Sequence, residues 1–205
     1  MRITLSRQLG AGGSLVAERV AERLGFQLVD RALVDSVAAR AGVPPADVAR
    51  LEERTPGLLE RFLHVSAAEL PDLFVPATGA QGELEEAKLV RATRALVREL
   101  AATGRVVIVG RGAWAILAAD PQALHARVVA PRAYRVAQLA ARGFDAKAAE
   151  TLLERSDTER ARYFETYYGL DVDDAAHFDV VLNAQRLGVE GAAELIVARA
   201  RALGW

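Results

Sequence analysis

The sequence contains no cysteine, one methionine and three histidines among its 205 residues. Without cysteine there are no disulfide bonds, no thiolate-bound metals and no cysteine nucleophile. His64, His125 and His177 lack the close pairing of histidine ligands in protein metal sites. No apolar run approaches the ~20 residues that a membrane-spanning helix requires. By elimination, we expect a cytoplasmic protein that does not contact membranes.

The sequence also lacks a marked excess of positively or negatively charged side chains. The chain has 26 Lys and Arg against 27 Asp and Glu, which gives a formal net charge of -1. A nucleic-acid backbone or an anionic membrane is usually met by a basic field, and this chain has none. We therefore expect nucleotide-sized small molecules as partners and no nucleic acid, with anions held by local groups. A homo-oligomer is left open.

Strand-like and helical segments alternate along the chain. The length favours a single domain, residues 1–205, with insertions. Strands that alternate with helices predict an α/β fold, a doubly wound parallel sheet with helices on both faces. Ligands bind such sheets beyond the carboxyl ends of the strands. The strand-like runs are "RITL", "FQLVD", "RVVIVG", "ALHARVVA" and "FDVVLN".

Two longer helices follow from apolar spacing. A helix is predicted over Glu83–Thr103, and the last helix of the chain carries a second apolar face. Prolines and glycines between Pro56 and Gly82 favour a partly helical insertion. The helix over Glu83–Thr103 has a stripe of Leu89, Thr93, Leu96 and Leu100. The last helix has Val189, Ala193, Ile196, Ala200 and Leu203 on one face.

A glycine-rich loop, "SRQLGAGGS", joins the first strand to the first helix. Backbone N–H groups at a helix start bind anions without help from a side chain. The usual phosphate-binding loop reads G-x-x-x-x-G-K-[ST], where the Lys contacts the terminal phosphates and the hydroxyl residue holds Mg²⁺. Aligned on Ser14, this loop has Gly13 at the Lys position and Arg7 at the first glycine.

Arg7 is the only cation of the loop, so we predict that its guanidinium points toward the donor phosphates. Arginine brings a planar fork where lysine brings a point charge. Ser14 is the expected metal ligand and the expected first helical or capping residue. The predicted phosphate cradle is Gly10, Ala11, Gly12, Gly13 and Ser14.

Arginines recur at two further places. In "VIVGRGAW", Arg111 lies between two glycines after a buried strand, at the expected ligand-binding rim. In "LLERSDTERARYFETYYG", Arg155, Glu159 and Arg162 share one helix face. That face is either a solvated ladder of ion pairs or the cationic surface that phosphoryl transfer needs. The tyrosines and phenylalanine that follow favour packing over base stacking.

Taken in order, these motifs with "LVDRALVDSVA", "VVAPRAYRVAQL" and "FDVVLNAQRLGVE" resemble the cytidylate kinase-like proteins. That family is related to the bacterial cytidylate kinases among the nucleoside monophosphate kinases. The resemblance spans nearly the whole chain and is weakest between Pro56 and Gly82. It implies a sheet with a phosphate-binding loop, a monophosphate-binding insertion at about 43–83, and an arginine-bearing lid at about 132–168.

The resemblance also implies roles for single residues. Asp30 and Arg31 match the start of the monophosphate site, and Arg111 matches the arginine that contacts the monophosphate. Asp157 is assigned to substrate binding in the lid segment. The lid arginines Arg155, Arg160 and Arg162 join Arg7 as catalytic candidates. Cytidylate kinases carry Lys at the position of Gly13 and Asp at the position of Val109, and their insertion is longer.

The expected activity is ATP-dependent phosphoryl transfer to a nucleoside monophosphate, with ATP and Mg²⁺ as cofactors. Two alternatives stay open. One is a nucleotide- or phosphate-binding module on the same fold with little or no turnover, which the missing Lys favours. The other is a kinase of another small hydroxyl-bearing substrate. The retained lid arginines favour catalysis.

Overall fold

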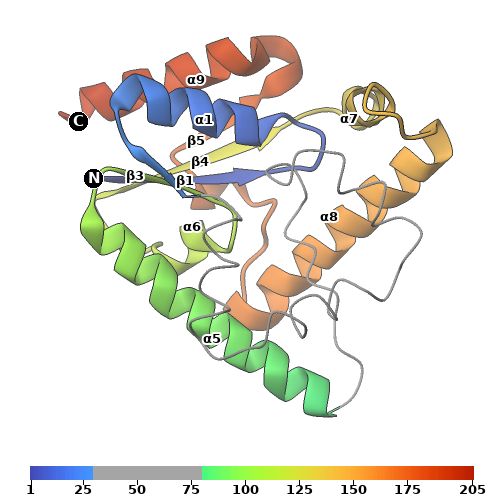
Figure 1. Ribbon diagram of the computed structural model, residues 1–205, viewed down its shortest axis with the longest axis horizontal. Coiled ribbons are helices and arrows are strands. Elements are labelled where there is room, and N and C mark those ends of the chain that lie inside the picture. Colours follow the sequence, from blue (N-terminus) through green and yellow to red (C-terminus); the bar gives the residue numbers. More distant parts are fainter. Residues whose placement is uncertain (30–79) are drawn as a thin grey trace.

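The computed structural model describes residues 1–29 and 80–205, and within 80–92 the side chains of residues 87, 90 and 91 only. Five parallel strands form one sheet in the order β2-β3-β1-β4-β5 (Figure 1). The α/β fold predicted from the sequence is confirmed, and each strand lies within or overlaps a predicted run. The strands are β1 (Arg2–Arg7), β2 (Gln27–Val29), β3 (Val106–Val109), β4 (Ala123–Val129) and β5 (Val180–Asn183).

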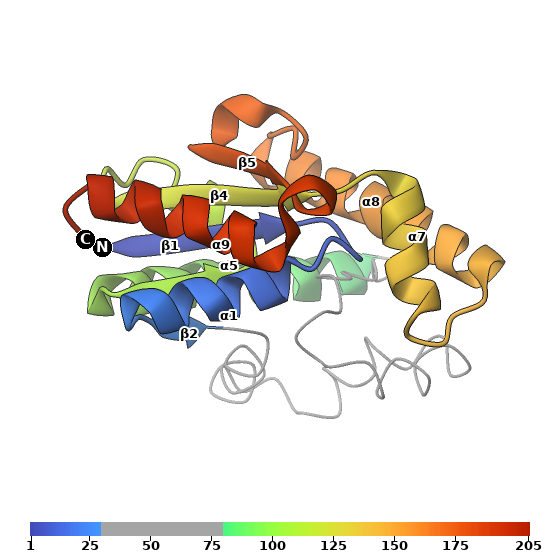
Figure 2. The same cartoon turned by 90° about the horizontal axis from the view of Figure 1, so that it is seen from above.

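Helices cover both faces of the sheet (Figures 1 and 2). α1 and α9 lie side by side on one face, and α5 and α6 lie on the other. α7 and α8 lie beyond the carboxyl ends of β1 and β4. The helices are α1 (Gly13–Leu24), α5 (Ala80–Thr103), α6 (Ala113–Ile116), α7 (Arg132–Ala140), α8 (Ala146–Tyr168), the short 3₁₀ helix η2 (Ala175–His177) and α9 (Ala184–Ala202).

The central strand β1 explains why the sheet forms. Ile3 and Leu5 on β1 are at most 1% exposed and pack with Val16 and Val20 of α1 and Ile196 of α9. Each such burial contributes about 1.5–3 kcal/mol relative to an exposed side chain. Because the carboxyl ends of parallel strands share an edge, the loops after β1, β3 and β4 meet there.

The predicted helices form with small differences at their ends. α5 begins at Ala80 rather than Glu83, and Thr93 and Leu96 are buried as the stripe predicts. Leu203 was predicted to continue the apolar face of the last helix, but the helix ends one residue before it. This side chain is 41% exposed because α9 ends at Ala202 and Leu203 forms its C-cap with non-helical backbone. Most of the predicted insertion lies outside the described residues.

Candidate functional site

A small pocket opens at the start of α1, at the carboxyl edge of the sheet. The helix begins at Gly13 after Gly12, which caps it in the left-handed region at φ 74°, with no side-chain cap and no acidic residue in the first turn. Ser14 is therefore the second helical residue and not the cap. A helix start without a competing carboxylate favours a bound anion. The pocket is lined by Arg7, Gln8, Gly10, Gly12, Gly13 and Ser14.

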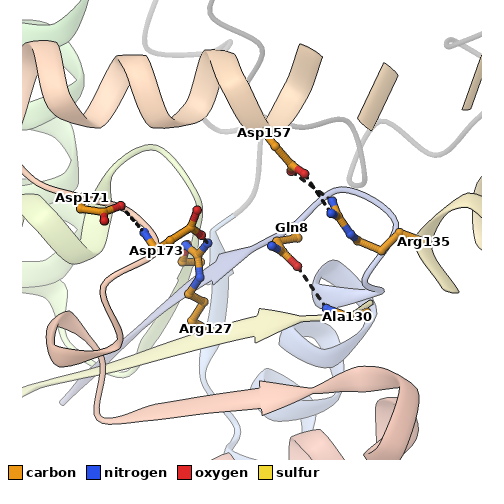
Figure 3. A network of polar contacts seen from close by, with 8 residues as sticks. Gln8, Arg127, Ala130, Arg135, Asp157, Asp171 and Asp173 are labelled. Carbon is orange, nitrogen blue, oxygen red and sulfur yellow. Dashed lines mark hydrogen bonds and ion pairs between the residues drawn. The ribbon is translucent and has the colours of Figure 1, made fainter. Parts of the chain in front are cut away.

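The loop is tied to its neighbours on two sides. The Gln8 N–H donates to Val128 O (3.0 Å), and Gln8 Oε1 accepts from the Ala130 N–H (3.1 Å), which fixes the loop to the end of β4 (Figure 3). At Gly10, a Cβ would lie 2.9 Å from the Arg135 carbonyl oxygen of α7. The loop thus approaches α7 so closely that only glycine fits at position 10.

Arg7 and Gly13 both line the pocket and lie in close contact with each other. Arg7 is the last residue of β1 and is 6% exposed. A Cβ built on Gly13 would lie 2.5 Å from Arg7 Cβ, 3.3 Å from its Cγ and 3.4 Å from its Cδ. The start of the Arg7 side chain therefore occupies the space that a side chain at position 13 would need.

Arg111 lies in a left-handed turn at the end of β3. Gly110, Arg111 and Gly112 have φ of 72°, 55° and 66°. A positive φ is uncommon for a residue other than glycine, and strained backbone of this kind clusters at functional sites. The Gly110 N–H donates to Leu5 O (3.0 Å), and Leu5 is two residues before Arg7 on β1. The turn therefore lies beside the end of β1.

The end of α8 packs against this turn. A Cβ on Gly112 would lie 2.9 Å from the Tyr168 hydroxyl oxygen. Arg94 of α5 holds the same end of α8, because its Nη2 donates to Tyr167 O (2.5 Å) and its guanidinium lies 4.6 Å from the centre of the Tyr168 ring. Sequence reasoning missed Arg94 and Tyr168 as supports of the turn. The predicted aromatic packing is confirmed by the cluster of Phe164 with Trp114.

The predicted lid residues point in different directions along α8. Arg155 is exposed and pairs with Glu159 (Nε to Oε1, 2.6 Å), and Arg162 is also exposed. Arg160 is only 7% exposed and lies on the buried stripe of the helix. Asp157 accepts two hydrogen bonds from a single arginine of α7. Asp30 and Arg31 lie outside the described residues.

Two buried arginines were not predicted. Arg135 of α7, 5% exposed, donates to both carboxylate oxygens of Asp157 at 3.0 and 2.8 Å (Figure 3). Arg127 of β4, 3% exposed, donates to Ser6 Oγ (3.3 Å) and pairs with Asp173. Burial lowers the pKa of Arg127, while the nearby carboxylates of Asp173, Asp157 and Asp171 raise it. A cation inside the apolar run "ALHARVVA" was the signal that could have indicated Arg127.

Comparison with known proteins places the chain in a family. The model of the cytidylate kinase-like family matches residues 2–186. The chain belongs to the cytidylate kinase-like family. Among curated relatives, it is 26% identical over 199 residues to a cytidylate kinase of Archaeoglobus fulgidus, covering 96% of this chain and 93% of that protein. It is 27% identical to a cytidylate kinase of Desulfurococcus amylolyticus, covering 96% and 90%.

Solved structures support the kinase-type fold of this family member. An uncharacterized protein from Eubacterium ventriosum superposes with a TM-score of 0.69 at 20% identity, covering 97% of each chain. Shikimate kinase from Acinetobacter baumannii, solved with shikimate, superposes with a TM-score of 0.51 at 13% identity, covering 98% of this chain and 93% of that one. Among the helices in the described ranges, none combines the length and apolarity needed to cross a bilayer.

Proposed function

We propose that this cytidylate kinase-like protein transfers the terminal phosphoryl group of ATP to a nucleoside monophosphate, forming ADP and a nucleoside diphosphate. The observation that carries the proposal is the pocket at the start of α1, which lies at the same edge of the sheet as the Arg111 turn. Such a pocket binds phosphate through backbone N–H groups and the helix dipole. Two phosphate sites side by side are what transfer between two nucleotides requires.

The loop residues would bind the donor. Gly12, Gly13 and Ser14 line the pocket, where the two glycines would offer backbone N–H groups and Ser14 a hydroxyl. Within residues 1–29 and 80–205, no group of His, Asp and Glu side chains is arranged to hold a metal ion. Mg²⁺ is commonly held by substrate phosphates, water and few protein ligands, which this loop can satisfy with Ser14. When bound, the ion would neutralise charge on the phosphates.

The acceptor would be held by Arg111, with Asp30 and Arg31 completing its site as the family resemblance implies. α7 and α8 fall within residues 132–168 and would form the lid. Arg155, Arg160 and Arg162 of α8 would bring positive charge to the transferred group. Of these three arginines, Arg160 alone is buried in this structure, so closure would have to bring Arg155 and Arg162 toward the phosphates.

A screen of nucleoside monophosphates tests the proposal. The protein with ATP and Mg²⁺ is assayed for ADP release with each monophosphate, and the thermal midpoint is measured with each ligand. We expect ADP release that depends on one class of acceptor, and a stabilisation of about 2.7 kcal/mol when a ligand is present at 100 times its Kd. The screen includes small non-nucleotide alcohols as alternative acceptors.

Two outcomes would contradict this function. Stabilisation by ATP without ADP release for any acceptor would favour a nucleotide-binding module, the second candidate. That candidate is supported by Gly13 and Val109, which stand where cytidylate kinases carry Lys and Asp. ADP release with a non-nucleotide alcohol alone would identify a kinase of another small substrate on the same scaffold.

A further inference from the structure

Glycine at position 13 is explained by space and not by backbone conformation. Gly10 and Gly12 have positive φ, whereas Gly13 is a helical residue without one. Any L-residue could adopt the backbone of Gly13, but its Cβ would lie 2.5 Å from Arg7 Cβ. Carbon atoms that are not bonded prefer about 3.5–4.0 Å. A side chain at position 13 and the side chain of Arg7 therefore exclude each other.

Arg7 stands where the strand pattern calls for a buried side chain. On β1, Ile3 and Leu5 point to the α1 face and are at most 1% exposed. Alternation along the strand puts Arg7 on the same face. Its side chain then runs past the start of α1, where it lines the pocket and is 6% exposed. The side chain of Arg7 therefore brings a positive charge to the wall of the pocket.

We propose that Arg7 supplies the cation that a lysine at position 13 supplies in other phosphate-binding loops, and that it contacts the phosphate chain of the donor nucleotide. The identity of that donor rests on the proposed function, but the anion site itself does not. The planar fork of Arg7 can hold two phosphate oxygens at once, which an ammonium cannot match in geometry.

The binding of inorganic tripolyphosphate, measured by calorimetry, tests the inference without requiring turnover. Arg7→Met removes the charge and keeps a long side chain on β1. We expect it to weaken tripolyphosphate binding by about ten- to a hundredfold. If the protein is a kinase, turnover should fall by about 10²–10³-fold. The matched control is Arg19→Met on α1, whose arginine is exposed and pairs with Glu190, and it should change neither quantity.

A swap of the two positions tests the exclusion. The close contact involves Arg7 Cβ, so Arg7→Ala would not relieve it and Arg7→Gly would. We expect Gly13→Lys alone to lower the thermal midpoint and to give no gain in binding. The double variant Arg7→Gly with Gly13→Lys should bind tripolyphosphate about tenfold more tightly than Arg7→Gly alone, because the lysine then has both room and an anion to meet.

The results separate this inference from the proposed function. Arg7→Met with wild-type affinity for tripolyphosphate and an unchanged thermal midpoint would overturn it. So would a wild type that does not bind tripolyphosphate, or a Gly13→Lys variant that is as stable as the wild type and binds more tightly. A wild type without kinase activity whose tripolyphosphate binding depends on Arg7 would refute the proposed function and support the role of Arg7.

Discussion

At the scale of the residue, Gly112 meets two constraints at once. Its φ of 66° is unfavourable for any side chain, and a Cβ would lie 2.9 Å from the Tyr168 hydroxyl oxygen. Gly104 separates the two effects, because its φ is 69° and no atom in the described part of the chain lies within 4 Å of the place a Cβ would take. The pair therefore offers a matched comparison of backbone strain with steric contact.

We predict that Gly104→Ala lowers the free energy of unfolding by about 1–2 kcal/mol, the cost of a left-handed residue with a side chain. Gly112→Ala should cost at least about 1 kcal/mol more, because the Tyr168 ring must also move. Urea denaturation of both variants measures the difference. Equal losses would show that the end of α8 yields to a side chain at position 112 without cost.

At the scale of the element, α7 and α8 are joined by the pair of Arg135 and Asp157. The two partners differ in exposure, since the side chain of Arg135 is 6% exposed and that of Asp157 is 36% exposed. Removal of the carboxylate leaves a buried charge without its partner. Removal of the guanidinium leaves a carboxylate that water can reach. The two losses should therefore be unequal.

We predict that Asp157→Ala lowers the free energy of unfolding by about 2 kcal/mol or more, and that Arg135→Met, which keeps the buried volume, costs less. The double variant should cost less than the sum of the two single variants, because the partners are in contact. Chemical denaturation of the four proteins gives this cycle. Additive losses would mean that the pair does not couple the helices.

The sequence predicted where the helices and strands lie better than it predicted which of their side chains face the candidate site. Strand runs such as "RVVIVG" are buried on both faces and could be read directly. On α8, spacing correctly grouped Arg155 with Glu159, but it did not show that Arg155 faces solvent. That orientation depends on Leu153 and Phe164, which pack into two different clusters at either half of the helix and turn Arg160 inward.

Residues that act through tertiary contact were the ones that could not be predicted. Arg127 and Arg135 carry no local sign of their partners, because Asp173 and Asp157 come from segments far along the chain. The exclusion between Arg7 and Gly13 was hidden as well. Sequence alignment places Gly13 at a lysine position, but only the turn of the loop brings it against the end of β1.

At the scale of the whole molecule, His125 links stability to pH. It lies on β4, 9% exposed, with Nδ1 2.7 Å from Thr4 Oγ1. Burial lowers the pKa of His125 below its ordinary 6.5, although Asp179 partly opposes the shift. The unfolded chain therefore binds this proton more readily than the folded one. Its contribution to stability is complete above pH 6.5 and is lost as the pH falls through the lowered pKa.

We predict that the free energy of unfolding rises with pH below about 6.5 and that His125→Gln makes this dependence shallower. The variant should have little effect on the slope above that pH, where histidine is neutral in both states. Urea denaturation at a series of pH values measures both slopes. A variant whose pH dependence equals that of the wild type would show that His125 does not contribute.

The contact between the glycine-rich loop and α9 bears on the order in which a newly made chain completes this region. A Cβ on Gly12 would lie 3.8 Å from Val189 of α9, and α9 also covers Val16 and Val20 of α1. At about 5–20 residues per second, α9 is synthesised on the order of ten seconds or more after the loop. Until α9 emerges from the ribosome, the nascent chain exposes one face of α1. The loop therefore gains its neighbour on α9 only after the four strands of the sheet that follow it in the chain have been made.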